Sequence, residues 1–264
     1  MRSNLDKKAL FSAFLFACTL AVRADDCRMP GPAEPAEIAA VLDGDTVRLA
    51  DNRRLRLLAF GTLEVDHEHP ERSSALALEA RKTLQYLLPK GSRVQLLADR
   101  EKYDGHGRTL AQLLRADGQD VARPLLERGL AHVYLFPPND RLWRCYDRYE
   151  QQARRARLGL WALPEFQPRP VRSLQPTASH YGLVRGTVTG YRKRSGAITV
   201  VLDERLHVRI RADNAGYFVA PFRLPGIGAE LTVRGQLNWR DDKAFVDLRH
   251  PQGLDVRPEV ISVY

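Results

Sequence analysis

Two carboxylates and two arginines in the first half of the chain have the types and the order that phosphodiester cleavage requires. Asp45 stands in an Asp-Gly-Asp-Thr turn, Arg56 follows in the next predicted strand, and Glu64 comes eight residues later. A loop that contains two glycines carries Arg108. One carboxylate can hold a divalent cation and the other can orient a water, while guanidinium groups neutralise the charge that develops on phosphate oxygens. The set predicts metal-assisted hydrolysis of a phosphodiester.

These side chains need strands and turns that bring them together, and the surrounding pattern predicts both. Residues 39–48 and 54–60 are β-rich apolar runs around a turn at 50–52, which predicts a hairpin. Apolar residues at three- and four-residue spacing in 74–88 predict an amphipathic helix. The remaining predicted elements are strands over 93–98 and 109–114 and helices over 121–128 and 140–158, the last of them capped by Asp140.

Taken in order, these motifs resemble those of the thermonuclease family, the staphylococcal-nuclease-like enzymes built on an OB fold. The resemblance covers residues 38–162 and is carried by 41–46, 55–57, Glu64, Asp104, 107–111, 129–131, Glu150, 153–154 and 159–161. It implies a five-stranded barrel that carries three helices, in agreement with the element order above. We therefore expect a mainly β fold with α-helices, built around an SNase-like OB-fold barrel.

The resemblance also implies roles for individual residues. Arg56 and Arg108 match arginines that grip the scissile phosphate, and Glu64 matches the general base. Tyr134 matches an aromatic residue that packs against a nucleotide base, with a half-buried core tyrosine as the alternative. The implied function is a nuclease that hydrolyses DNA or RNA with low sequence specificity.

The metal site departs from the family pattern at one position. Asp45 matches a calcium-ligating carboxylate, and Thr62 and Asp43 are further candidate ligands, although Asp43 is also typical of a turn-capping residue. The family usually carries a second ligating acid three residues before the base, where this chain has Gly61. Calcium prefers six to eight oxygens, so the missing carboxylate weakens the site and makes other divalent metals candidates. The alternative is a catalytically impaired relative that still binds nucleic acid.

Proline-rich stretches divide the chain, and short strands dominate its last third. Five strand candidates favour a small all-β, OB-like barrel, with an immunoglobulin-like sandwich as the competitor. They span 184–191, 197–202, 207–211, 230–237 and 244–248. Arg192, Lys193 and Arg194 at a hairpin tip are candidate nucleic-acid-binding residues. The predicted parts are a signal peptide (1–24), an extended linker (25–37), the thermonuclease-like domain (38–163), a Pro-rich linker (164–178) and the small barrel (179–258).

The amino-terminal stretch and the cysteines indicate export. Basic residues precede an apolar run over 9–22, and small residues around Ala24 predict cleavage of a secretory signal there. Cleavage leaves Cys27 and Cys145, and such an even pair in an exported chain predicts a disulfide. We expect a periplasmic or secreted protein with no transmembrane segment, because the apolar run is too short to span a bilayer comfortably.

The composition agrees with this interpretation. The chain has 264 residues, of which 44% are hydrophobic, and this excludes a wholly disordered polymer. Its 41 Lys and Arg against 32 Asp and Glu give a net charge of +9, which favours partners that carry phosphate or acidic lipid headgroups. We expect a monomer whose partner is DNA or RNA, single-stranded or flexible.

Overall fold

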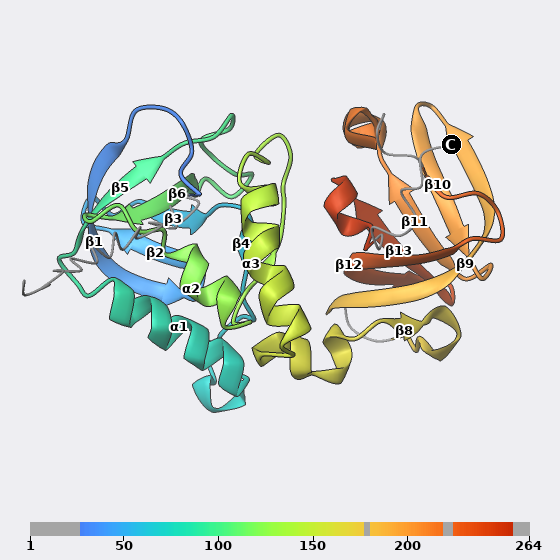
Figure 1. Cartoon of the computed structure of the whole chain (residues 1–264), viewed down its shortest axis with the longest axis horizontal. Helices are drawn as coiled ribbons and strands as arrows, with labels where there is room; N and C mark the ends of the chain where they lie inside the picture. Colours follow the sequence, from blue (N-terminus) through green and yellow to red (C-terminus); the bar gives the residue numbers. More distant parts are fainter. Residues whose placement is uncertain (1–26, 177–179, 219–223, 256–264) are drawn as a thin grey trace, which may run out of the picture.

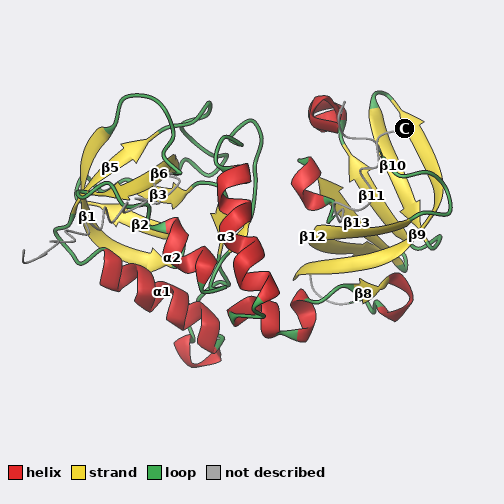
Figure 2. Ribbon diagram, viewed as in Figure 1, coloured by secondary structure: helices red, strands yellow, loops and turns green. Residues whose placement is uncertain are grey.

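The computed structural model describes residues 27–176, 180–218 and 224–255 and consists of two β-barrels with three α-helices (Figures 1 and 2). The predicted signal peptide over 1–24 lies outside the described residues. Among the helices that the structure describes, none is long and apolar enough to cross a membrane.

Five strands of the first part close into a barrel in the order β1-β2-β3-β6-β5. Their bounds are β1 (Glu34–Asp43), β2 (Thr46–Leu49), β3 (Arg54–Leu57), β5 (Arg93–Leu97) and β6 (Thr109–Arg115). The β3–β6 pair is parallel and the other pairs are antiparallel. The strand order confirms the expected fold class, a mainly β, SNase-like OB-fold barrel with helices.

Three helices and one very short ladder surround this barrel. They are α1 (Ala75–Leu87), α2 (Ala122–Glu127), α3 (Trp143–Arg155) and the antiparallel pair of β4 (Phe60–Gly61) with β7 (His132–Val133). The Ser74 hydroxyl caps α1 by accepting a hydrogen bond from the Ala77 amide at 3.1 Å. The predicted cap at Asp140 is wrong, because α3 begins at Trp143 and the Asp140 carboxylate pairs with Arg100 instead.

The second part repeats the strand order of the first. Its strands are β9 (His180–Arg194), β10 (Ala197–Leu202), β11 (Leu206–Ile210), β12 (Glu230–Arg240) and β13 (Lys243–Leu248). Because β9 pairs with both β10 and β12, the pairings close a ring in the order β9-β10-β11-β13-β12, and β11–β13 is its parallel pair. The two-residue β8 (Arg169–Pro170) adds to β9.

Short 3₁₀ turns connect these elements. They are η1 (Pro70–Arg72), η2 (Gly159–Ala162), η3 (Pro164–Phe166), η4 (Val171–Ser173), η5 (Ala212–Phe218) and η6 (Pro251–Gly253). Each barrel has its own apolar core, and a third cluster, which includes Ala153, Trp161, Phe166 and Leu183, packs between them. The elements between the barrels are therefore part of the packed structure.

A disulfide between Cys27 and Cys145 ties the segment before β1 to helix α3. The two cysteines are 118 residues apart in the sequence. In the chain-entropy model, closing so long a loop stabilises the folded state by about 4–5 kcal/mol. The structure thus contains the disulfide that the cysteine count predicts.

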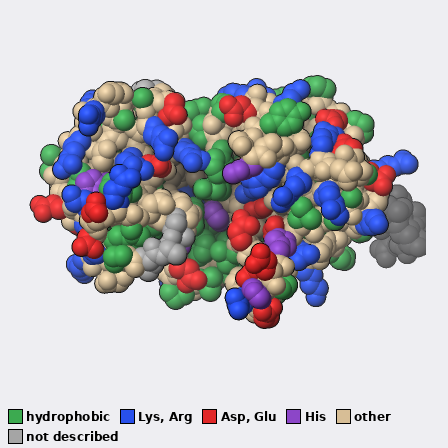
Figure 3. Space-filling model, turned by 180° about the vertical axis from the view of Figure 1, so that it is seen from behind, with side chains coloured by type: hydrophobic (Ala, Val, Ile, Leu, Met, Phe, Trp, Pro, Cys, Tyr) green, Lys and Arg blue, Asp and Glu red, His purple; other side chains and the backbone are tan. Residues whose placement is uncertain are grey.

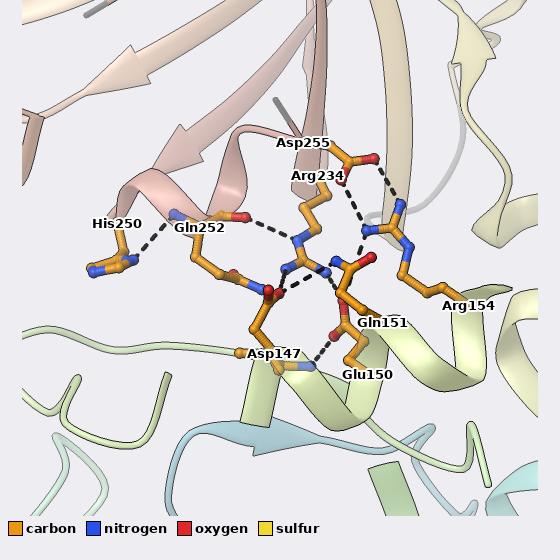
Figure 4. A network of polar contacts seen from close by, with 9 residues as sticks. Asp147, Glu150, Gln151, Arg154, Arg234, His250, Gln252 and Asp255 are labelled. Carbon is orange, nitrogen blue, oxygen red and sulfur yellow. Dashed lines mark hydrogen bonds and ion pairs between the residues drawn. The ribbon is translucent and has the colours of Figure 1, made fainter. Parts of the chain in front are cut away.

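Helix α3 also carries the ionic contact between the two barrels (Figure 4). Arg234 of β12 is 4% exposed and its guanidinium pairs with the carboxylate of Glu150, which is fully buried. The other Glu150 oxygen accepts a hydrogen bond of 2.5 Å from the Val133 amide. Beside this pair, Arg154 forms two hydrogen bonds, of 2.9 and 2.7 Å, with Asp255. The second barrel therefore completes the environment of a buried acid that belongs to the first part.

This pair leads to a prediction about stability. Arg234→Met leaves the buried Glu150 carboxylate with only the longer, 3.9 Å ion pair to Arg154, which should lower the free energy of unfolding by about 3 kcal/mol. The double variant Arg234→Met, Glu150→Gln should recover part of this loss, because the amide oxygen of glutamine can still accept from Val133. Urea denaturation followed by circular dichroism measures both.

A matched control is Arg123→Ala, which breaks the exposed pair of Arg123 with Glu127 and should cost about 1 kcal/mol or less. If Arg234→Met cost no more than this control, the pair would not be the stabilising contact described here.

Candidate active site

The turn between β1 and β2 brings two acids to one end of the first barrel. Asp43 ends β1 and is the register partner of Thr46 in β2. A Cβ at Gly44 would lie 2.7 Å from Thr62 Cγ2 and 2.8 Å from Ala80 Cβ, so only glycine fits between the turn, the β4 segment and helix α1. The turn is thereby pressed against the residues that follow β4.

Asp45 is a buried carboxylate whose hydrogen bonds are satisfied within the site. The residue is 2% exposed, and its Oδ2 accepts from the Thr62 amide at 3.1 Å. Its Oδ1 accepts from the Thr46 hydroxyl at 2.9 Å. The guanidinium of Arg56, which lies in β3 opposite Thr46, is 3.0 Å from Oδ2. Since a buried charge is tolerated only when it is paired, Asp45 and Arg56 hold each other in place.

Arg56 is further fixed by the main chain. Its Nη1 donates a hydrogen bond of 2.8 Å to the Leu57 carbonyl, and only 14% of its side chain is exposed. Arg108 is held differently, because its Nε donates to Asp104 Oδ2 at 2.7 Å and its own amide donates to Oδ1 of the same residue. Gly107 has φ +74°, a backbone conformation that favours glycine and lets the loop turn back before Arg108.

The charges of the two other acids and of the two arginines all affect the pKa of Glu64. Partial burial raises its pKa, and the negative charges of Asp45 and Asp43 raise it further. The positive charges of Arg56 and Arg108 act in the opposite direction. The two arginines and the two other acids that the sequence singled out thus lie within electrostatic range of Glu64, and Asp45 and Arg56 are in direct contact.

Asp43 is partly engaged in other contacts. Its Oδ2 lies 3.0 Å from His67 Nε2, and its Oδ1 is 3.4 Å from the Val65 amide. Among the described residues no group of three or more His, Cys, Asp or Glu side chains is placed to hold a metal ion. Of the two candidate acids, Asp45 is the one whose carboxylate contacts both the Thr62 amide and the Arg56 guanidinium.

The position of the missing acid borders a buried histidine. A Cβ at Gly61 would lie 3.5 Å from Arg56 Nη2 and 3.5 Å from His132 Cε1, which are ordinary contact distances. His132 pairs with Gly61 between β7 and β4. Burial, assisted by Arg234 and Arg56, lowers the pKa of His132 to about 3, so that its imidazole is neutral.

Aromatic side chains link this histidine to the second barrel. The ring of Tyr181, from β9, lies 4.1 Å from that of His132, and Phe166 packs at 5.9 Å from Tyr181. Tyr134 is half-buried and makes edge contacts with Phe136 at 4.7 Å and Tyr181 at 6.0 Å. Tyr134 therefore belongs to an aromatic cluster beside the site.

Sequence reasoning missed His132 and Tyr181. His132 directly follows the Gly-Leu-Ala motif at 129–131, and this adjacency was the available signal. No spacing links Tyr181 to the site, because it comes from the other barrel. Arg192, Lys193 and Arg194 are exposed near the end of β9 and belong to the second barrel rather than to the cluster around Asp45.

A closed OB barrel with arginines and acids gathered at one end of its first strands defines an OB-fold domain of the nuclease class. A family model described as staphylococcal nuclease homologue matches residues 54–163. The micrococcal nuclease of Shigella flexneri is 32% identical over 142 residues, which cover 50% of this chain and 75% of that protein. The thermonuclease of Staphylococcus intermedius is 28% identical over 127 residues, which cover 47% of this chain and 74% of that protein. Protein ParB of Escherichia coli is 30% identical over 141 residues, which cover 48% of this chain and 72% of that protein.

The chain belongs to the family of staphylococcal nuclease homologues. The matched residues end at 163, so the second barrel lies outside the family model. The comparisons thus confirm the resemblance of the first part to the thermonuclease family.

The environment of Glu64 predicts how its carboxyl titrates. Because its pKa is raised, the base form should be lost at a higher pH than the usual glutamate value of about 4.3 as the pH falls. Asp43→Asn removes one of the negative charges that raise it, so the midpoint should move to lower pH. A side-chain carboxyl NMR titration of the cation-free protein measures both midpoints.

The matched control is Asp117→Asn. Asp117 lies in an exposed turn and pairs with Arg115, so its replacement should leave the titration midpoint of Glu64 unchanged. A Glu64 midpoint at the ordinary glutamate value would contradict the described electrostatics.

Proposed function

We propose that this chain is an exported nuclease that hydrolyses phosphodiester bonds of DNA and RNA with low sequence specificity. The observation that supports it is the buried ion pair of 3.0 Å between Asp45 and Arg56 at one end of the first barrel, with Glu64 within electrostatic range of both Arg56 and Arg108. Family membership adds that the matched relatives include proteins named as nucleases.

The residues of the cluster divide the chemical work. Arg56 and Arg108 would bind the phosphate and neutralise the charge that grows on its nonbridging oxygens during attack by water. Glu64 would orient that water and accept its proton, and a raised pKa brings a carboxylate closer to the range that suits a general base. Asp45 positions Arg56 through their 3.0 Å ion pair.

A divalent cation would bind at Asp45, with Thr62 and Asp43 at its side. One buried carboxylate is a smaller donor set than calcium prefers, but it suits a cation that keeps most of its waters and gains oxygens from the substrate phosphate. Such an ion would supply additional positive charge next to the phosphate. We propose calcium as this cation, weakly held, with other divalent metals able to replace it.

Digestion of plasmid and single-stranded DNA tests the proposal. Cutting should require calcium, manganese or zinc and stop with chelator, and Glu64→Gln should lower kcat by about 10²- to 10⁴-fold because the proton acceptor is lost. Glu68→Gln, an exposed residue of the same loop, is the matched control and should retain full activity. Cutting by Glu64→Gln at the rate of the control would refute the assigned role.

Gly61 predicts a gain of metal affinity. An aspartate side chain there would meet only ordinary contacts at its Cβ and would add a carboxylate beside Arg56. Gly61→Asp should therefore lower the calcium concentration for half-maximal cutting by about tenfold, since calcium favours charged oxygen ligands. Gly61→Asn has the same shape without the charge and should not produce this gain. Equal calcium dependence in the two variants would contradict the prediction.

A second candidate function is nucleic-acid binding without efficient turnover. Gly61 favours it, because the donor set has lost one carboxylate relative to the family pattern. Retention in a gel-shift assay that falls steeply with salt, without cutting in any of these metals, would identify this alternative.

Export and oligomeric state are also part of the proposal. The Cys27–Cys145 disulfide is typical of oxidising compartments, which supports export to the periplasm or the medium. We propose that the exported protein, cleaved near Ala24, is a monomer.

A further inference from the structure

The outer face of two strands in the second barrel carries a row of basic and aromatic side chains. Along β13, Ala244, Val246 and Leu248 are buried while Lys243 and Arg249 at either end are exposed. The outward residues of β13 and its parallel neighbour β11, together with the residue directly after each strand, form what we call the β11–β13 track. It consists of His207, Arg209, Arg211, Lys243, Phe245, Asp247 and Arg249. Its four Lys and Arg side chains outnumber its one acid, Asp247.

One end of the track is a hollow of about 330 Å³. It is lined by residues that include Tyr191, Arg192, His207 and Lys243. His207 is 6% exposed, and its Nε2 has no hydrogen-bond partner among the described residues. Burial, together with the charges of Lys243, Arg192 and Arg209, lowers the pKa of His207. The charged side chains that line the hollow are the cations Arg192 and Lys243 and one acid, Glu204. Such a hollow suits an anionic group that also accepts a hydrogen bond.

The middle of the track offers an aromatic surface. The rings of His207 and Phe245 stack at 5.1 Å with an angle of 27° between their planes. The Arg209 guanidinium lies 5.1 Å from the centre of the Phe245 ring. Asp247, the acid of the track, holds Arg209 through hydrogen bonds of 2.7 and 3.0 Å. Base stacking on aromatic rings beside fixed arginines is how single-strand-binding barrels hold their ligand.

The other end of the track reaches the catalytic barrel. The Arg249 guanidinium lies 4.6 Å from the ring centre of Phe136, which in turn contacts Tyr134. A second hollow of about 190 Å³ is lined by Tyr134, Asn238, Asp247 and Arg249 among others. The space-filling view shows Lys and Arg side chains on both sides of a furrow between the two barrels (Figure 3). The track therefore meets the aromatic cluster next to the candidate active site.

We propose that the β11–β13 track binds single-stranded nucleic acid and leads it to the catalytic barrel. From Lys243 to Arg249 the strand rises by about 20 Å, which is long enough for several nucleotides. Phosphates lie against Lys243, Arg249 and the His207 hollow, and bases stack on Phe245 and Tyr191. The proposal rests on the proposed function only in taking nucleic acid as the ligand, and binding to the track does not require turnover.

Binding of a fluorescein-labelled oligothymidylate of 16 nucleotides, measured by anisotropy, tests the track. Every protein carries Glu64→Gln and the buffer contains chelator, so that the strand stays intact. The double variant Lys243→Ala, Arg249→Ala should raise Kd about tenfold and reduce the slope of log K against log salt by about 1.4, as expected for two lost contacts to a single strand. Phe245→Leu should raise Kd about tenfold with little change of the salt slope.

The matched control is Arg172→Ala, Arg185→Ala, which removes two exposed positive charges beside β8 and outside the track. If the control weakens binding as much as the track variant, or if neither changes Kd, the proposal is overturned. It is also overturned if a 16-base-pair duplex binds as tightly as the single strand and responds equally to Phe245→Leu. In a duplex the bases are already paired and stacked on one another, so they cannot stack on the Phe245 ring.

A cutting assay separates this proposal from the proposed function. With Glu64 restored, the track variant should cleave a small phosphodiester, thymidine 3′,5′-bis(4-nitrophenyl phosphate), at the rate of the control but digest long single strands more slowly. Absence of cutting in all proteins, together with track-dependent binding, would refute the nuclease and support the track. Normal cutting with equal binding by the track and control variants would refute the track alone.

Discussion

The buried carboxylate of Asp45 is the constraint on which the site depends. A charge with 2% exposure must be matched by donors, and here the Thr62 amide, the Thr46 hydroxyl and the Arg56 guanidinium supply them. Each donor comes from a different element, so satisfying one acid fixes the turn after β1, strand β3 and the chain after β4 relative to one another. The barrel thereby holds Arg56, the arginine that we propose to bind phosphate, in a fixed position.

The second barrel reaches this arrangement by packing and by charge. Tyr181 covers His132, whose ring lies beside the space above Gly61, and Arg234 compensates the fully buried Glu150. Because Glu150 also accepts from the Val133 amide, the short β4–β7 ladder is connected to the same ion pair. Two parts that are far apart in sequence thus share one polar and aromatic interface.

Local patterns predicted the elements well, whereas contacts between distant segments were outside their reach. The helical spacing in 74–88 is intrinsic to the sequence, because burial of one helix face selects it, and α1 occupies Ala75–Leu87. The β-rich run over 39–48 was predicted as one strand, but the structure divides it, with β1 ending at Asp43 and β2 beginning at Thr46. The two-residue strands β4 and β7 are too short to produce any period. Asp140 looked like a cap but pairs with Arg100, which the pattern around it does not reveal.

For the site, the identities of Asp45, Arg56, Glu64 and Arg108 followed from residue type, order and family resemblance. Their mutual pairing did not, since spacing gives no information on which donor faces Asp45. The contributions of His132 and Tyr181 arise only when the second barrel packs on the first. A side chain that acts across an interface leaves no local signal in its own segment.

Helix α3 contacts both barrels. One of its faces packs Tyr146 into the core of the first barrel, and Glu150 and Arg154 turn toward partners in the second. The matched family region stops at residue 163. A fragment that ended there would lack Arg234 and Asp255, the partners of Glu150 and Arg154. In this chain two charged side chains of the nuclease-like portion consequently take their partners from the barrel that follows it.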